Sequence, residues 1–517
     1  MSSSYAGAST QLAVSANLAS LEHRNLQVFG NYQRTFFAGS WRTNEADVIT
    51  SARLARVLHD HGIRAGDRVL AFLPNSPQVL WSFNAVWTLG ATIIPAPPQC
   101  TAPELSYFIK HSGASLVLTS PLLVNQAWAG CKLVGVTKCL CFGASEIESI
   151  PDISRQIEDG PSIDVPFDCA PGMLALILYT SGTTARPKGV MLTHGNLAAA
   201  INAVTQANGD IEHAPMLHVL PLTHIFGLLM LQLANKWGFR SVLIPQFDPL
   251  AVLDAIQRYE IGYMLLVPTM LNYLLRHPQR ASFDTSSLRR VITGGAPIPE
   301  PLRQDFEREF RCRVEQGYGM TETGFVACYG EDEAYRQGSV GRPCPTFECK
   351  IVNEYGVELS SGEPGELYVK APSVTSCYWK DPELTASAFS DGWFHTGDIG
   401  YLDDDKYLYI TDRKKDLIIK GGENISPSEI EEALAAHPGV MEVAVIGVPD
   451  ERFGEEICAV ILRKPESDLF EESVIEFASK KLNRFKVPSR VVFETTLPRN
   501  AAGKVNKRML REQLVRK

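Results

Sequence analysis

This 517-residue chain lacks the sequence features of a membrane protein, of a secreted disulfide-rich protein and of a nucleic-acid binder. No apolar run reaches the roughly 18 residues that a membrane-spanning helix needs, and residues 1–11 show no signal-peptide pattern. The 11 cysteines are scattered and form no Cys-x-x-Cys pair, which favours reduced thiols. The net charge is −9, whereas nucleic-acid binding relies on clustered positive charge. We therefore expect a cytoplasmic protein with no stable membrane insertion and no nucleic-acid partner.

The hydrophobic pattern predicts an α/β fold. Short runs rich in Val, Ile and Leu alternate with amphipathic, helix-like stretches such as 48–61 and 250–259. Continuous apolar strands between helices are typical of largely parallel sheets, and the length requires at least two domains. The predicted strands are 68–73, 116–118, 174–179, 242–244, 263–267 and 291–293.

The pattern changes near residue 400. Residues 399–411 alternate around the acidic turn 403–405, which predicts a hairpin. The segment 426–429 reads Ser-Pro-Ser-Glu, which predicts a helix start with a capping box and Pro at the first helical position. A small α+β domain of about 100 residues is expected to follow.

Residues 179–190 are the most informative segment, because a turn rich in hydroxyls follows an apolar strand there. Exposed backbone N–H groups, hydroxyls and a Lys suit a polyphosphate, which needs several donors at once. The spacing is not that of a Walker A loop, since Gly-Lys-Ser/Thr is absent. A Ser/Thr-rich loop without a ligand would have the same composition, so this turn alone leaves both readings open. The candidate phosphate-binding residues are Thr180, Ser181, Gly182, Thr183, Thr184 and Lys188.

Two further glycine-containing segments, 293–297 and 316–323, point to a nucleotide. Glycines let the backbone approach a flat ring closely, and Tyr318 offers an aromatic face. Thr321 supplies a hydroxyl, and Glu322 supplies a hard carboxylate oxygen suited to Mg²⁺. Either segment alone is a weak signal, but together and after the hydroxyl-rich turn they form a strong one.

The chain resembles the adenylate-forming superfamily of acyl-CoA synthetases, peptide-synthetase adenylation domains and luciferases. The resemblance covers about residues 50–511 and is closest to the acyl-CoA synthetases. It includes, in the family's order, the segments above and also 393–398, 412–416, 420–424 and 497–505. The chain departs at Ala185, where the family usually has Gly; Ala tolerates left-handed backbone poorly, so a stiffer loop is expected.

The resemblance implies a role for each matching residue. Adenine is expected between the Gly295 segment and Tyr318, the ribose on Asp398 and Arg413, phosphate on Thr321 and the metal on Glu322. The implied ATP-binding set is Thr180, Ser181, Gly182, Thr183, Thr184, Lys188, Gly295, Ala296, Pro297, Gln316, Gly317, Tyr318, Gly319, Thr321, Asp398, Arg413 and Lys504. The implied catalytic residues are Lys504, Glu322 and Thr321.

The resemblance also implies a division of the chain at a hinge, Lys415. Residues 1–414 would form the large domain that binds ATP and the acid, and 415–517 a small mobile domain that carries Lys504. Hinges lie at the ends of elements, where few torsions absorb a large rotation. The Lys420, Gly421 and Gly422 loop would line the tunnel for coenzyme A.

The acid-binding pocket is predicted from residues 221–228, which resemble the segment that borders the acyl pocket in acyl- and aryl-CoA ligases. The implied pocket residues are His224, Phe226, Gly227, Gly295, Gly319 and Met320. No Phe-Asp pair stands near this segment to hold an ammonium group, which favours an acid without one. A buried structural role for His224 stays open, and so does the choice among fatty, aromatic and terpenoid-like acids.

The expected reaction is that of an acid–thiol ligase using ATP, Mg²⁺ and coenzyme A. The acid would be activated as an acyl-adenylate, with release of pyrophosphate, and then transferred to the thiol with release of AMP. Three alternatives stay open: a ligase that loads the phosphopantetheine of a carrier protein, a luciferase-like oxygenase, and a non-catalytic sensor. The oligomeric state is not indicated.

Overall fold

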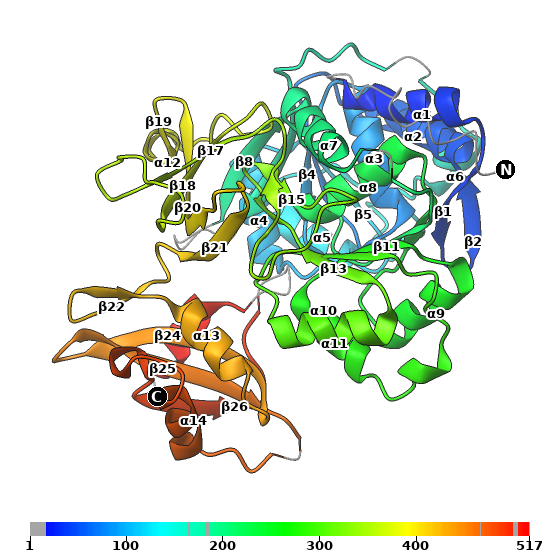
Figure 1. Cartoon of the computed structure of the whole chain (residues 1–517). Helices are drawn as coiled ribbons and strands as arrows, with labels where there is room; N and C mark the ends of the chain where they lie inside the picture. The colour runs from blue at the N-terminus through cyan, green and yellow to red at the C-terminus, as the bar shows by residue number, and fades with distance from the viewer. Residues whose placement is uncertain are drawn as a thin grey trace.

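The computed structural model describes residues 17–163, 166–180, 187–209, 211–465, 467–499 and 505–515. The chain forms a large lobe and a smaller lobe that begins after β21 (Leu408–Arg413) (Figure 1). None of the helices in these ranges is long and apolar enough to cross a membrane.

A seven-stranded sheet forms one layer of the large lobe. Its strand order is β13-β12-β11-β9-β10-β1-β2, and every pair is parallel except β1 with β2. The strands are β1 (Gln33–Phe37), β2 (Ser40–Thr43), β9 (Met216–His218), β10 (Ser241–Leu243), β11 (Tyr263–Leu266), β12 (Arg290–Thr293) and β13 (Arg313–Gln316). One face carries α9 (Pro249–Tyr259), α10 (Pro268–Arg276) and α11 (Glu300–Phe310), whose apolar side chains form a continuous core with it.

A six-stranded sheet forms the second layer, in the order β6-β5-β3-β4-β7-β8. It is parallel except for the β7–β8 hairpin. The strands are β3 (Arg68–Phe72), β4 (Thr92–Ala96), β5 (Leu116–Thr119), β6 (Cys139–Cys141), β7 (Leu174–Thr180) and β8 (Lys188–Thr193). Its outer face is covered by α4 (Ala102–Ser112) and α5 (Val124–Val134).

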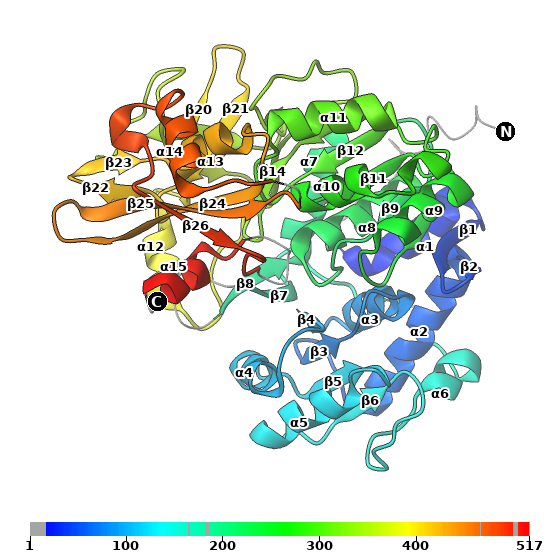
Figure 2. The ribbon, with the colours of Figure 1, turned by 90° about the horizontal axis from the view of Figure 1, so that it is seen from below.

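The main hydrophobic core lies between these two sheets. It contains apolar side chains of α1 (Leu21–Phe29), α2 (Asn44–Asp60), α3 (Pro77–Thr88), α7 (His194–Asn208) and α8 (Ile225–Trp237). Of these helices, α3 and α8 are buried over most of their surface, as expected for helices covered on both sides. Figure 2 shows this layer between the two sheets, with α9 to α11 and α4 to α5 on the outer sides.

Two small antiparallel sheets complete the large lobe. One contains β14 (Tyr318–Met320), β15 (Gly324–Cys328) and β16 (Arg342–Pro343); the other contains β17 (Glu348–Val352), β18 (Gly365–Lys370), β19 (Phe389–Ser390), β20 (Trp393–Leu402) and β21. They share one core. The short helix α12 (Pro382–Ala388) stands beside β19 and β20. Elsewhere in the lobe, η1 (Leu18–Ser20) contacts α1 and α3, α6 (Ser154–Asp159) contacts α2, and η2 (Arg280–Ser282) contacts α10.

The small lobe is an α+β unit with cores of its own. Its sheet contains β22 (Ile418–Lys420), β23 (Glu423–Ile425), β24 (Val440–Asp450), β25 (Gly454–Arg463) and β26 (Arg490–Glu494). The helices are α13 (Pro427–Ala435), α14 (Glu471–Ser479), η3 (Arg484–Lys486) and α15 (Lys507–Val515).

The predicted fold class is confirmed, and so is the predicted hairpin, which is formed by β20 and β21. β20 begins six residues earlier than predicted, at Trp393, so the motif that ends at Asp398 lies within a strand. One local prediction needs correction. Only one of the two hydrogen bonds of the predicted capping box is present: the Ser426 side chain accepts from the Glu429 N–H. The Glu429 carboxylate instead forms an ion pair with Lys486 at 2.6 Å. An ion pair to a neighbouring element has replaced the return hydrogen bond.

Candidate active site

The predicted phosphate turn joins the two strands of the β7–β8 hairpin. Thr180 is paired with Lys188 in the hairpin register, so the two ends of the turn are held together. The predicted residues Ser181, Gly182, Thr183 and Thr184, together with Ala185, lie outside the described residues. On the flanks, the Tyr179 hydroxyl bonds to Nδ1 of His111 at 2.8 Å, and the Tyr107 hydroxyl donates to the Pro187 carbonyl at 2.9 Å.

Lys188, Glu322 and Tyr378 meet at the base of this turn. Nζ of Lys188 lies 2.6 Å from Oε1 of Glu322 and donates to the Tyr378 hydroxyl at 3.0 Å. The same hydroxyl donates to Oε1 of Glu322 at 2.9 Å, and the ammonium lies 4.4 Å from the centre of the Tyr378 ring. Burial and the neighbouring carboxylate raise the Tyr378 pKa, so this phenol stays a donor. The predicted phosphate and metal residues are therefore brought together.

Tyr378 is a site residue that the sequence did not reveal. It precedes α12 in a segment without a recognisable motif, and the contacts that place it reach residues 190 and 56 positions away. The adjoining backbone is fixed as well, because the Thr375 N–H donates to the Glu322 carbonyl at 2.7 Å. Thr321, beside Glu322, is buried.

The predicted ribose residues lie next to the predicted adenine residue. The β20–β21 register pairs Asp398 with Arg413, and Nε of Arg413 lies 3.0 Å from the carboxylate. The Tyr318 hydroxyl donates to the other oxygen of Asp398 at 2.6 Å. Asp398 raises the pKa of Arg413, and burial together with the carboxylate raises the pKa of Tyr318. One buried carboxylate thus orders an aromatic ring and a half-exposed guanidinium around itself.

The backbone segments 293–297 and 316–320 run side by side. The Gly317 N–H donates to the Thr293 carbonyl at 2.8 Å, and the Gln316 side chain accepts from the Ile298 N–H at 3.1 Å. Gly295 has a φ of +86°, which disfavours a side chain there. These contacts place Gly294 to Pro297 beside the strand that leads to Tyr318.

A cavity lined by Leu220, Pro221, His224, Phe226, Leu265, Val267, Gly294 and Gly295 lies beside these segments. It joins three residues predicted for the acyl pocket, namely His224, Phe226 and Gly295. Gly227 and Gly319 do not line this cavity; an added Cβ would lie 2.2 Å from the Pro221 carbonyl oxygen and 2.0 Å from the Gly324 carbonyl oxygen, respectively. Met320, the last residue of β14, does not line this cavity.

In the small lobe, the predicted tunnel glycines form an exposed turn between β22 and β23. Gly421 and Gly422 both have positive φ, 59° and 85°. Lys420 points inward, where Nζ lies 2.6 Å from the Glu456 carboxylate. The predicted hinge residue, Lys415, lies close enough to the site that Arg413 and Lys188 add to the effect of burial in lowering its pKa. Lys504 lies outside the described residues.

Asp412 connects the end of β21 to the first turn of α13. Both Ser426 and Ser428 donate their hydroxyls to its carboxylate, and burial raises its pKa from 3.8 to about 6.

The Asp412 carboxyl group binds its proton more tightly in the folded state than in the unfolded state. Its contribution to the stability of the fold is therefore complete below about pH 4 and is lost as the pH rises through about 6. We therefore expect Asp412→Asn to raise thermal stability at pH 7.5, by roughly 2 kcal/mol, and to leave it nearly unchanged at pH 4. Thermal melts at both pH values would check this. Asp404 is an exposed residue on the same hairpin, so the control Asp404→Asn should change the thermal stability equally little at both pH values. Equal effects of Asp412→Asn at pH 4 and pH 7.5 would contradict the expectation.

Comparison with known proteins agrees with this geometry. Residues 36–379 match the AMP-binding enzyme family, and residues 429–504 match the AMP-binding enzyme C-terminal domain. The chain belongs to the AMP-binding enzyme family, which confirms the predicted superfamily.

Similar proteins include a long-chain-fatty-acid–CoA ligase of Bacillus subtilis, 33% identical over 502 residues, which cover 90% of this chain and 89% of that protein. A feruloyl-CoA synthase of Amycolatopsis is 36% identical over 470 residues, which cover 89% and 92%. The crystal structure of ATP-bound MatB from Rhodopseudomonas palustris has a TM-score of 0.88 at 33% identity, over 96% of this chain and 98% of that one. The apo form of MatB gives 0.78 over the same shares.

Proposed function

We propose that this chain activates a carboxylic acid with MgATP and transfers the acyl group to coenzyme A. The class itself, an AMP-forming acid–CoA ligase, is confirmed by relatives that carry this activity in their names. The observation that carries the detailed assignment is the meeting of Lys188, Glu322 and Tyr378 close to the Asp398–Arg413–Tyr318 group.

In the first half-reaction, a carboxylate oxygen of the acid attacks the α-phosphorus of ATP. A mixed acyl–phosphate anhydride forms, and the bond to the pyrophosphate oxygen breaks. Lys188 would bind phosphate oxygens, since its ammonium lies at the base of the predicted phosphate turn, and Asp398 would accept from the ribose hydroxyls. Lys504 would offset the charge of the two anions as they approach each other.

The donor set suits a magnesium ion that arrives with the nucleotide. Within the described residues, no group of three or more His, Cys, Asp or Glu side chains forms a protein cage for a metal. Mg²⁺ is commonly held by one or two carboxylates together with phosphate oxygens and water. The buried carboxylate of Glu322, at the base of the predicted phosphate turn, fits this pattern. When bound, the ion would neutralise charge on the triphosphate. Tyr378 would hold the Glu322 carboxylate in place while Lys188 turns to the phosphates.

In the second half-reaction, the sulfur of coenzyme A attacks the acyl carbon, the thiol proton is released, and AMP leaves. Lys504 and the thiol need the same approach, so we assign residues 415–517 to a mobile domain that turns about Lys415. The exposed Gly421–Gly422 turn would then line the thiol's path. This chain matches ATP-bound MatB with a TM-score of 0.88 and apo MatB with 0.78, so it resembles the ATP-bound form more closely.

The test is a screen for pyrophosphate release over a panel of carboxylic acids, with and without coenzyme A. Release with at least one acid, AMP as the nucleotide product, and thioester only when coenzyme A is present would support the proposal. A phosphopantetheine-bearing carrier protein should replace coenzyme A poorly. Release of phosphate and ADP, or no release with any acid, would overturn it.

A further inference from the structure

The second half of helix α4 contacts both strands of the β7–β8 hairpin near its turn. The Tyr107 hydroxyl donates to the carbonyl of Pro187, the residue before Lys188, at 2.9 Å. Nδ1 of His111 bonds to the hydroxyl of Tyr179, on the opposite strand, at 2.8 Å. Residues four apart on a helix are neighbours on its surface, so Tyr107 and His111 face the hairpin together. One helix thus holds the chain on both sides of the turn.

Aromatic packing supports these two hydrogen bonds. The Tyr107 ring is stacked on the His111 ring, with centroids 5.2 Å apart and an interplanar angle of 19°. The Tyr179 ring is stacked on Phe108 of the same helix, with centroids 4.5 Å apart and an angle of 22°. Stacked rings restrict the side-chain torsions, so both hydroxyls are held in direction as well as in distance.

The segment that contains Trp379 joins α4 to the same hairpin. The His111 carbonyl, near the end of α4, accepts from the Trp379 indole N–H and from the Lys380 ammonium, both at 2.9 Å. The Trp379 backbone N–H donates to the Gly189 carbonyl at 2.8 Å. An added Cβ at Gly189 would lie 3.2 Å from Cβ of Trp379 and 3.4 Å from the Tyr179 ring, so the contact is tight. Helix, hairpin and segment therefore form one connected network.

This network ends at the Lys188 side chain. The backbone before Lys188 is held by Tyr107, whereas its ammonium lies 2.6 Å from Glu322 and 3.0 Å from the hydroxyl of Tyr378, the neighbour of Trp379. A lysine loses much rotamer freedom when it is fixed on a ligand. Fixing it beforehand removes that cost from the binding step, which increases the affinity for the ligand.

We propose that Tyr107 and His111 are positioning residues for phosphate binding, and that they order Lys188 before ATP arrives. The proposal rests on the proposed function. Neither residue would touch the reacting atoms, because both act through the end of the hairpin. Their effect is confined to the first half-reaction, since pyrophosphate has left before coenzyme A reacts.

The first test is Tyr107→Phe, which removes the hydroxyl and keeps the ring on His111. We expect the KM for ATP in pyrophosphate release to rise about fivefold, the effect of one lost hydrogen bond, with kcat within about twofold. Thioester formation from supplied acyl-adenylate and coenzyme A should be unchanged. His111→Phe, which keeps a ring beside Tyr107 but loses the bond to Tyr179, should raise the KM for ATP about threefold. An unchanged KM for ATP in both variants, or an equal loss in thioester formation, would overturn the proposal.

A double-mutant cycle tests whether Tyr107 acts through Lys188. The Kd of MgATP would be measured by calorimetry for the unaltered protein, Tyr107→Phe, Lys188→Met and the double variant. In the protein that carries Lys188→Met, Tyr107→Phe should raise the Kd less than about 1.5-fold, because the group that it positions is gone. A fivefold rise in that protein as well would show that Tyr107 acts on the fold alone, and would overturn the proposal.

Tyr407→Phe is a matched control. Its hydroxyl also donates to a backbone carbonyl, that of Ala334 at 3.3 Å, but it lies at the opposite end of the β20–β21 hairpin from the Asp398–Arg413 pair. The KM for ATP should not change in this variant. If no acid releases pyrophosphate from the unaltered protein, the proposed function itself has failed. If acids release it and the α4 variants keep the original KM for ATP, only the positioning proposal has.

Discussion

Replacing Lys504 by alanine is expected to slow adenylate formation by about 10²–10³-fold, which corresponds to roughly 3–4 kcal/mol of transition-state stabilisation. The attack of a carboxylate on the α-phosphate brings two anions together. A cation that bridges them is worth more in the transition state than in the ground state, so the loss should fall on kcat. Thioester formation from supplied acyl-adenylate and coenzyme A should stay within about threefold of the original rate, because the lysine acts only in the first half-reaction.

Pyrophosphate release and thioester formation from supplied adenylate would be measured separately. Lys480→Ala is a suitable control, since it also removes a lysine from the small lobe. Lys480 pairs with Glu476 at 2.7 Å on α14, but both side chains are more than two-thirds exposed, so both half-reactions should be unaffected. Full adenylation activity in Lys504→Ala, or an equal loss in both half-reactions, would contradict the assigned role.

The fold and much of the candidate site could be predicted because the signals are local. Buried parallel strands read as continuous apolar runs, and the turns after them carry their chemistry in consecutive residues. The segment around Tyr318 and the strand that contains Asp398 were recognisable separately. Their hydrogen bond follows from the fold, since 80 residues separate the two partners.

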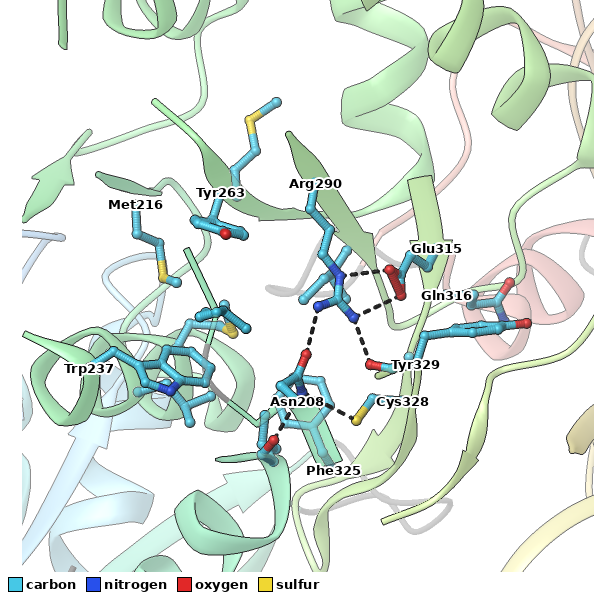
Figure 3. A pocket seen from close by; sticks show the side chains of 17 residues that line it. Asn208, Met216, Trp237, Tyr263, Arg290, Glu315, Gln316, Phe325, Cys328 and Tyr329 are labelled. Atoms are coloured by element: carbon cyan, nitrogen blue, oxygen red, sulfur yellow. Dashed lines mark hydrogen bonds and ion pairs between the residues drawn. The ribbon is translucent and has the colours of Figure 1, made fainter. Parts of the chain in front are cut away.

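Tyr378 and the cavity between α7, α8 and the seven-stranded sheet (Figure 3) could not be predicted, because no local pattern encodes them. Tyr378 becomes a site residue only where the chain returns to β8 and to Glu322. That cavity is lined by side chains from seven elements, namely α7, α8, β9, β11, β12, β13 and β15, and from the segments between them, and each of these elements has an ordinary core pattern in the sequence. In the sequence, Arg290 is a charged residue at the start of a predicted strand, and only the structure shows that its two terminal nitrogens donate to Asn208, Glu331, Glu315 and the Tyr329 carbonyl.

Asp398→Asn is expected to raise the KM for ATP by about 10²-fold while kcat changes only a few-fold. Hydrogen bonds to a charged group contribute about 1.5–3 kcal/mol, and the variant weakens those to the ribose while disturbing Arg413 and Tyr318. The ribose does not react, so its contacts stabilise ground state and transition state alike, and their loss appears in KM. Lys504→Ala should show the opposite pattern.

The assignment of Asp398 to the ribose can be separated from a structural role with 2′,3′-dideoxy-ATP. The original protein should lose about as much kcat/KM with this nucleotide as it loses through Asp398→Asn with ATP. The variant should lose little more when both changes are combined, because the same interaction is then removed twice. Asp404 is exposed on the β20–β21 hairpin, so the control variant Asp404→Asn should lose as much kcat/KM with the dideoxy nucleotide as the original protein does. If the two losses simply added, Asp398 would act on the fold and not on the sugar, since groups that do not interact contribute independently.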